Sequence, residues 1–171
     1  MEKETERNEK GQPMAACVFV MSNDGKVLAV SRKDDPNDFG MPGGKVDKGE
    51  TPAEAAAREF KEETGLRASN LRQVFQHYDG GHCTHTFCGD VGGQIDTDEG
   101  GIVRWVDPLI LIDQSRFVDY NRRLFAVLDL APCPECGSEP GCNIDCETCM
   151  APRTMRVALG ELRQMIRSFM K

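Results

Sequence analysis

Three glutamates in one short segment are the residues of this 171-residue chain best suited to chemistry. Glu59, Glu62 and Glu63 are spaced i, i+3 and i+4, so their carboxylates share one face if the segment is a helix. Crowded carboxylates repel one another, and a hard divalent cation such as Mg²⁺, which prefers oxygen ligands, would offset that repulsion. A hydrated Mg²⁺ in turn suggests a substrate that carries phosphate.

The residues around these glutamates predict the helix that must hold them. Thr51 is a good N-cap, Pro52 suits the first helical position, and Glu54 completes a capping box with Thr51. Gly65 is a natural C-terminal stop, so we expect the helix over about residues 52–64. Its apolar stripe, which can dock on a core, comprises Ala53, Ala56, Ala57 and Phe60.

Residues 44–66 resemble the Nudix box, G-x5-E-x7-R-E-U-x-E-E-x-G-U with U apolar, and every fixed position is filled. A charged surface helix can show two or three glutamates by chance, but rarely this whole spacing with both caps. The resemblance implies an α/β fold over residues 12–131, an α/β/α sandwich with a mixed sheet. It also implies hydrolysis of a nucleoside diphosphate linked to another moiety, by attack of water on phosphorus, with Mg²⁺ or Mn²⁺ as cofactor.

The resemblance assigns roles to residues of the box. Arg58 would orient a box carboxylate through a charge-assisted bond, and Glu50 would fix the loop geometry or assist the metal. The carbonyl of Gly43 could join the metal shell, although a plain tight turn also explains this glycine. The expected catalytic residues are Glu50, Arg58, Glu59 and Glu62. The expected metal ligands are Gly43, Glu59, Glu62 and Glu63.

Two further segments are candidates for completing the site. The general base is either Glu59 or an acidic residue of the loop at 92–101, where Asp98 and Glu99 are candidates and a solvated loop is the alternative. Tyr120 and Asn121 could contact a base of the substrate, but core packing of the tyrosine and a solvated asparagine are favoured.

Hydrophobic patterning predicts the other elements of the domain. Apolar runs at 15–21 and 26–32, joined by a turn signal, predict a hairpin. Extended stretches at 70–78 and 82–91 predict a second hairpin with a Gly-rich turn. His and Cys residues in the second stretch could suggest a metal site, but their alternation is typical of a half-buried strand. A strand over 102–106 and a helix over 116–130 complete the prediction.

Five of the eight cysteines lie between residues 133 and 149, in a segment that we assign to an extension at 132–171. Cys-Pro-x-Cys-Gly resembles a zinc knuckle, and the simplest interpretation is a structural Zn²⁺ bound by Cys133, Cys136, Cys146 and Cys149. Cys142 could replace one ligand, and disulfides or free thiols are the alternatives. Residues 153–171 predict an amphipathic helix that packs on the parent domain or forms a homodimer.

Composition excludes several classes of protein. A net charge of −7 argues against a general binder of nucleic acid or anionic membranes, but not against a nucleotide substrate. No apolar run approaches the roughly 20 residues needed to span a bilayer. Residues 1–10 are charged and lack the apolar core of a signal peptide, so we expect a cytoplasmic protein with a disordered tail at 1–11.

The resemblance leaves the substrate open. Compact length and brief loops after the box favour a nucleoside triphosphate or a similar small nucleotide. The combination of a Cys cluster and a Nudix box resembles that of NADH pyrophosphatases. Their cluster precedes the catalytic domain, however, and their motif S-Q-P-W-P-F-P-x-S is absent here. An NADH- or ADP-ribose-type pyrophosphatase stays an alternative. A non-catalytic nucleotide sensor is another, although the complete set of box carboxylates favours an enzyme.

Overall fold

A computed structural model describes residues 4–96, 101–128 and 130 of the chain. The described residues fall into two compact units, divided after Arg116. Several predicted features lie outside the described residues: Asp98, Glu99, the predicted zinc ligands and the predicted C-terminal helix. The predicted boundary after residue 131 therefore stays a prediction.

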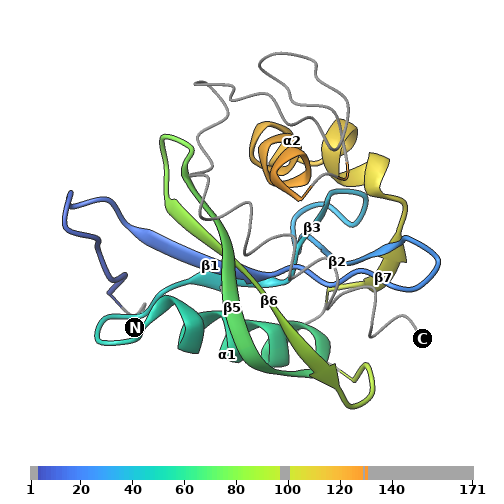
Figure 1. Cartoon of the computed structure of the whole chain (residues 1–171), viewed down its shortest axis with the longest axis horizontal. Coiled ribbons are helices and arrows are strands. Elements are labelled where there is room, and N and C mark those ends of the chain that lie inside the picture. Colours follow the sequence, from blue (N-terminus) through green and yellow to red (C-terminus); the bar gives the residue numbers. More distant parts are fainter. Residues whose placement is uncertain (1–3, 97–100, 129, 131–171) are drawn as a thin grey trace. The chain divides into compact units, whose positions relative to one another are not determined.

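The first unit is built on two sheets (Figure 1). The order of its four-stranded sheet is β4 (Gly43–Lys45), β1 (Met14–Val18), β6 (Cys83–Gly92) and β5 (Arg67–Tyr78). The β1–β6 pair is parallel and the other pairs are antiparallel, so the sheet is mixed. An antiparallel three-stranded sheet has the order β3 (Phe39–Gly40), β2 (Val27–Ser31) and β7 (Val103–Val106).

Helix α1 (Pro52–Thr64) begins and ends where the sequence predicts. The Thr51 hydroxyl accepts a hydrogen bond from the Glu54 amide, and the Glu54 carboxylate accepts one from the Thr51 amide. Gly65 adopts the left-handed conformation with φ of 76°, and its amide donates to the Lys61 carbonyl. The capping box and the glycine stop are both confirmed, and the mixed sheet with its helix confirms the α/β class.

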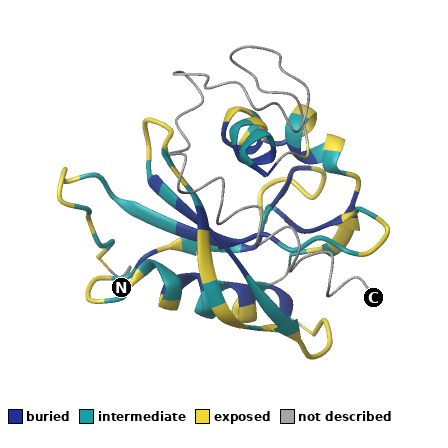
Figure 2. Cartoon of the chain, in the orientation of Figure 1, coloured by how far each residue is buried: buried dark blue, intermediate teal, exposed yellow. Residues whose placement is uncertain are grey.

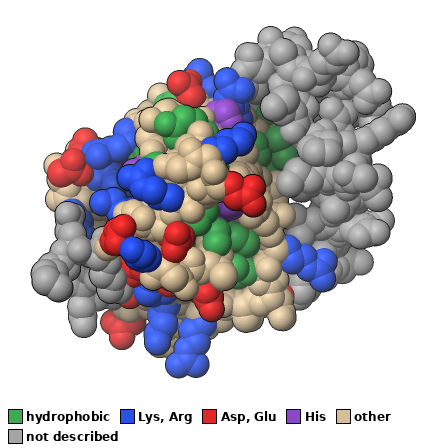
Figure 3. Space-filling view, turned by 90° about the vertical axis from the view of Figure 1, so that its left-hand side faces the viewer, with side chains coloured by type: hydrophobic (Ala, Val, Ile, Leu, Met, Phe, Trp, Pro, Cys, Tyr) green, Lys and Arg blue, Asp and Glu red, His purple; other side chains and the backbone are tan. Residues whose placement is uncertain are grey.

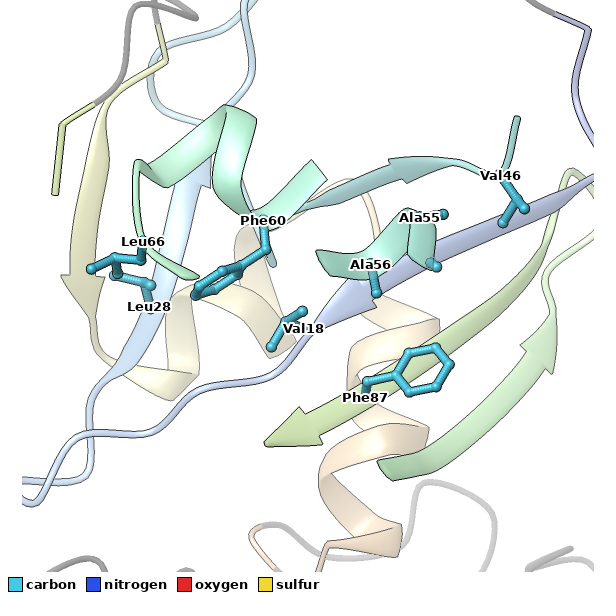
Figure 4. Packing of buried hydrophobic residues seen from close by; sticks show 9 residues of the cluster. Val18, Leu28, Val46, Ala55, Ala56, Phe60, Leu66 and Phe87 are labelled. Atoms are coloured by element: carbon cyan, nitrogen blue, oxygen red, sulfur yellow. The ribbon is translucent and has the colours of Figure 1, made fainter. Parts of the chain in front are cut away.

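The core of this unit joins α1 to both sheets (Figure 4). Its buried members are Ala16, Val18, Leu28, Val46, Ala55, Ala56, Phe60, Leu66 and Phe87. Ala55 is fully buried, whereas Ala57, predicted to lie on the apolar stripe, stays partly exposed. Figure 2 shows α1 with one buried face and one exposed face, as an amphipathic helix requires. Packing of this face fixes how the helix presents its glutamates.

The predicted hairpin of residues 15–32 forms only as a local turn. Met21 bridges Val27, and the Ser22 amide donates to the Lys26 carbonyl at 2.8 Å. Before this turn the Phe19 amide donates to the Phe87 carbonyl, which keeps β1 in the four-stranded sheet. The Leu28 amide also donates to the Val20 carbonyl at 3.0 Å. Beyond this point β2 pairs with β3 and β7, so the two strands enter different sheets and the hairpin is confirmed only around its turn.

The second predicted hairpin, β5–β6, is confirmed. Its turn is closed by the Asp79 carboxylate, which accepts hydrogen bonds from the Gly81 and His82 amides, each at 2.9 Å. The half-buried pattern expected for the second strand is wrong in its middle, because residues 85–88 are all buried. This strand lies between β1 and β5, so both of its edges are paired, and the burial of four consecutive residues means that both of its faces are covered there.

Residues 4–11 also differ from the predicted disordered tail at 1–11. Thr5 bridges Asp47, and Arg7 bridges Pro13, both in antiparallel geometry. The Glu6 amide donates to the Val46 carbonyl at 2.7 Å. Backbone pairing of this kind does not depend on side-chain hydrophobicity, which explains why a charged sequence gave no sign of it.

The remaining helices are short. A π-helix, η1 (Ile110–Gln114), precedes the unit boundary and was not predicted. In the second unit, α2 (Val118–Val127) confirms the central part of the predicted helix. Tyr120 is buried as predicted, while Asn121 is buried instead of solvated. No helix among the described residues is long and apolar enough to cross a membrane.

Candidate active site

The Arg58 guanidinium is the centre of the candidate site. Its Nε and Nη2 donate to the two carboxylate oxygens of Glu50, each at 2.9 Å. Its Nη1 donates to Glu59 at 2.7 Å, and to Glu62 at 3.2 Å. One arginine therefore connects three of the glutamates singled out in the sequence, and its fork geometry orients each of them.

Glu50 stands outside α1 but is fixed by two sets of contacts. Besides the bidentate pair with Arg58, its carboxylate accepts the Asp47 amide at 3.1 Å. Hydrogen bonding to Arg58 is the main reason that the pKa of Glu50 lies below its ordinary value. Glu50 is thus a charged anchor for Arg58, and its predicted role of fixing the loop geometry or assisting the metal stays a prediction.

Glu59 lies against the backbone of Gly44. A Cβ at residue 44 would come within 2.6 Å of both carboxylate oxygens of Glu59, so only glycine lets this side chain keep its observed position. Burial is the main cause that raises the pKa of Glu59, while Arg58 acts in the opposite direction. A carboxylate with a raised pKa beside other carboxylates is typical of a functional site.

Glu63 meets the preceding glycine. The Gly43 amide donates to its carboxylate at 2.8 Å, across the space between β4 and α1. Gly43 is also packed tightly against β1, since a Cβ there would lie 2.3 Å from the Ala16 carbonyl oxygen. The Gly43–Gly44 pair therefore faces the strand on one side and the glutamates of α1 on the other, which a plain turn would not require.

Glu62 is the most exposed of the three, with 47% of its side chain accessible against 19% for Glu59. The structure thus brings together Gly43, Glu50, Arg58, Glu59, Glu62 and Glu63, as expected from the sequence. Asp47 was not singled out, although its carboxylate lies 3.7 Å from Arg58 and helps to raise the pKa of Glu59. Its position three residues before Glu50, in a Gly-containing turn, was the available signal.

The residue types fit a divalent cation, although the side chains are not arranged as a finished metal shell. Within residues 4–96, 101–128 and 130, no three His, Cys, Asp or Glu side chains form such a group. The cause is local, because Arg58 donates to Glu59 and Glu62 while the Gly43 amide donates to Glu63. Carboxylates beside a glycine backbone are suitable ligands for Mg²⁺ or Mn²⁺, and Arg58 is the competing positive charge.

Comparison with known families decides the assignment. The family model described as the NUDIX domain matches residues 11–128, which is more than half of the chain. The chain belongs to the Nudix family. The resemblance inferred from residues 44–66 is therefore confirmed for the domain that contains the box.

Two similar curated proteins carry the names of nucleotide pyrophosphatases. A Bacillus subtilis protein with the provisional name 8-oxo-dGTP diphosphatase is 40% identical over 98 residues, which cover 54% of this Nudix chain and 65% of the relative. An ADP-ribose pyrophosphatase from Methanocaldococcus jannaschii is 46% identical over 56 residues, covering 32% and 33%. The chain spans less than two thirds of the length of either relative.

Solved structures support the same fold. A Chromobacterium violaceum protein provisionally assigned to the Nudix hydrolases superposes with a TM-score of 0.61 at 23% identity, covering 91% of this chain and 90% of that one. A MutT structure from a study of Aliivibrio salmonicida and Vibrio cholerae has a TM-score of 0.51 at 21% identity, covering 63% and 94%. At these identities the likeness establishes the Nudix fold alone.

Proposed function

We propose that this Nudix protein hydrolyses a pyrophosphate bond in a small nucleotide and requires Mg²⁺ or Mn²⁺. The observation that carries the proposal is the gathering of Glu59, Glu62 and Glu63 beside Gly43 and Gly44, with Arg58 between two of them. These carboxylates would repel a phosphate substrate unless a cation is present. A pure binding module would not need to keep all of them.

The proposed metal ligands are the carboxylates of Glu59, Glu62 and Glu63 and the carbonyl of Gly43. When bound there, the cation would neutralise charge on the diphosphate and lower the pKa of an attacking water. Glu59 can accept a proton, because burial raises the pKa of its carboxyl above the ordinary value. Asp98 and Glu99, outside the described residues, stay candidates for the same role.

Arg58 and Glu50 are proposed to act as positioning residues. Glu50 holds the guanidinium through Nε and Nη2, so Arg58 keeps its place even if the bonds of its Nη1 to Glu59 and Glu62 change. Arg58 thereby limits how far these two carboxylates can move. Preorganised carboxylates of this kind do not need to reorganise during the reaction, which is where such sites gain rate.

The proposed substrate is a nucleoside triphosphate or a similar small nucleotide. One similar protein carries the provisional name 8-oxo-dGTP diphosphatase, and another is named ADP-ribose pyrophosphatase, which supports two concrete candidates. The first alignment covers more of the present chain, so the triphosphate is preferred. The proposed catalytic domain is residues 12–131, and the family match over 11–128 supports it.

Surface charge agrees with a small-molecule substrate. On the face shown in Figure 3, basic and acidic side chains of the described residues are interspersed instead of forming one continuous basic patch. The net charge of −7 points the same way, since nucleic-acid binding depends on neutralising many phosphates with Lys and Arg. Structural Zn²⁺ at the C-terminal cysteines stays a separate prediction.

A nucleotide panel with product identification tests the proposal. The purified chain would be incubated with Mg²⁺ and canonical or oxidised nucleoside triphosphates, ADP-ribose or NADH. Nucleoside monophosphate plus pyrophosphate is the expected product pair from a triphosphate. Conversion of ADP-ribose alone would favour the alternative substrate, and conversion of no nucleotide would contradict the proposed activity. Omission of the cation should abolish turnover.

A further inference from the structure

The N-terminal segment runs beside the loop that leads into α1 (Figure 1). The Glu6 amide donates to the Val46 carbonyl at 2.7 Å, and the Lys48 amide donates to the Glu4 carbonyl at 2.8 Å. Thr5 lies opposite Asp47 in an antiparallel bridge. Residues 4–6 therefore pair with residues 46–48 through one antiparallel bridge and its two backbone hydrogen bonds.

The Glu6 side chain reaches further along the same loop. Its Oε2 accepts the Gly49 amide at 2.7 Å, while its Oε1 accepts the Arg7 amide at 3.1 Å. Gly49 has a φ of 84°, in the left-handed region that favours glycine, and it sits in the turn between Asp47 and Glu50. Glu6 thus secures a turn whose backbone needs a fixed conformation.

This turn is connected directly to the candidate active site. The Asp47 amide donates to the Glu50 carboxylate at 3.1 Å, and the Glu50 amide donates to the Asp47 carbonyl at 2.9 Å. Glu50 in turn holds Arg58 through two hydrogen bonds of 2.9 Å. A continuous set of contacts therefore leads from Glu6 through the turn and Arg58 to Glu59.

We propose that residues 4–6 are a positioning segment for the site, with Glu6 fixing the turn that presents Glu50 to Arg58. This inference rests on the proposed function, because it assumes that Glu59 and its neighbours bind a cation. It adds that an N-terminal segment, remote in sequence from the box, controls the geometry of the box. Neither the family motif nor the catalytic assignments include these residues.

A purely structural role explains the segment less well. Glu4 and Arg7 are exposed, and no residue from 4 to 7 belongs to the hydrophobic core of the unit. Core burial is the main source of folding stability, so this segment should add little to it. Arg7 contacts Gly11 and Pro13, and the Glu6 carbonyl accepts the Met14 amide, but the Glu6 carboxylate contacts the turn that anchors Arg58. Loss of the Glu6 carboxylate should therefore loosen the turn and leave the core unchanged.

The test compares Glu6→Ala with Glu6→Gln and with Glu9→Ala as a matched control. Glu9 is exposed and lies in the same N-terminal segment, and its substitution by alanine removes the same charge. Hydrogen exchange of the full chain would be measured at the amides of residues 47–50. Mn²⁺ affinity without nucleotide would be measured by calorimetry, and kcat and KM would be measured on the substrate found in the panel.

In Glu6→Ala we expect hydrogen exchange at the Gly49 amide to be about tenfold faster than in the parent. We expect this variant to bind Mn²⁺ about three- to tenfold more weakly. Its kcat should fall by a similar factor with little change in KM or melting temperature. Glu6→Gln should recover most of the parent behaviour, because its amide oxygen can accept the Gly49 amide. Glu9→Ala should behave as the parent.

The outcomes separate this inference from the proposed function. Parent-like Gly49 exchange or parent-like Mn²⁺ affinity in Glu6→Ala would overturn the positioning role. Equal effects of Glu6→Ala and Glu9→Ala would overturn it as well, since they would point to net charge alone. A parent chain that binds no Mn²⁺ would contradict the proposed function, and with it the assumption on which this inference rests.

Discussion

Substitution of Gly44 by alanine should separate activity from stability. The new Cβ would lie 2.5 Å from Glu59 Cδ and 2.6 Å from both carboxylate oxygens. Ordinary contact begins near 3.4 Å, so the oxygens must recede by roughly 3.4 − 2.6, or about 0.8 Å. The end of a flexible side chain can make this shift, and the backbone at Gly44 has no positive φ that would oppose alanine.

The expected magnitudes follow from that displacement. A misplacement of about 1 Å in a catalytic group costs about 100-fold in rate, so we expect a loss of that order. The free energy of unfolding should change by less than about 1 kcal/mol, since alanine also restricts the unfolded chain. Activity would be measured on the preferred nucleotide with Mg²⁺, and stability by urea denaturation.

Gly43→Ala is the matched control, because its Cβ would meet backbone instead of side chain. The nearest atoms are the Ala16 carbonyl oxygen at 2.3 Å and Cys17 Cβ and Cα at 2.5 and 2.6 Å. Neither neighbour can move without opening the β1–β4 pairing, so this variant should lose about 1–3 kcal/mol of stability. The reasoning fails if Gly44→Ala keeps the parent rate, or if both variants lose equal stability.

Three further predictions concern charge and protonation. Lysine cannot reproduce the bidentate pair of Arg58 with Glu50, so the kcat of Arg58→Lys should fall about 10-fold or more with little change in melting temperature. A parent-like kcat would contradict the positioning role of Arg58. Burial lowers the pKa of His85 below the unfolded value of 6.5, so the folded state binds fewer protons. Melting temperature should therefore fall as pH drops through 6.5 and below, and less steeply in His85→Gln. Burial raises the pKa of Cys17 to about 12, which leaves roughly one thiol in 10⁴ ionised at pH 8. Mass spectrometry should find Cys17 unmodified by iodoacetamide until the chain is denatured.

The sequence predicted α1 closely because its signals are local. Thr51 and Glu54 satisfy each other at the start of the helix, and Gly65 terminates it, so no distant contact is needed. The spacing of the glutamates then placed three carboxylates together. Capping and helical spacing depend on a few adjacent residues, which is why sequence patterns describe them well.

Features that depend on distant pairing were not predictable in the same way. The entry of β1 and β2 into different sheets is decided by strands that follow much later in the chain. The four hydrogen-bond partners of Arg58 are the Lys45 carbonyl and three glutamates, and this set requires the path of the preceding loop. Residues 4–7 pair through backbone groups that every residue carries, so their side chains gave no signal.

The central claim is that the glutamates of α1 carry metal-dependent hydrolysis, and Glu63→Gln tests it most directly. The variant would be compared with the parent and with Glu54→Gln, whose side chain lies on the same helix and can still cap it. Initial rates would be measured at saturating nucleotide with Mg²⁺. We predict that Glu63→Gln loses at least about 100-fold in kcat while Glu54→Gln keeps the parent rate. Full activity in Glu63→Gln would contradict the account.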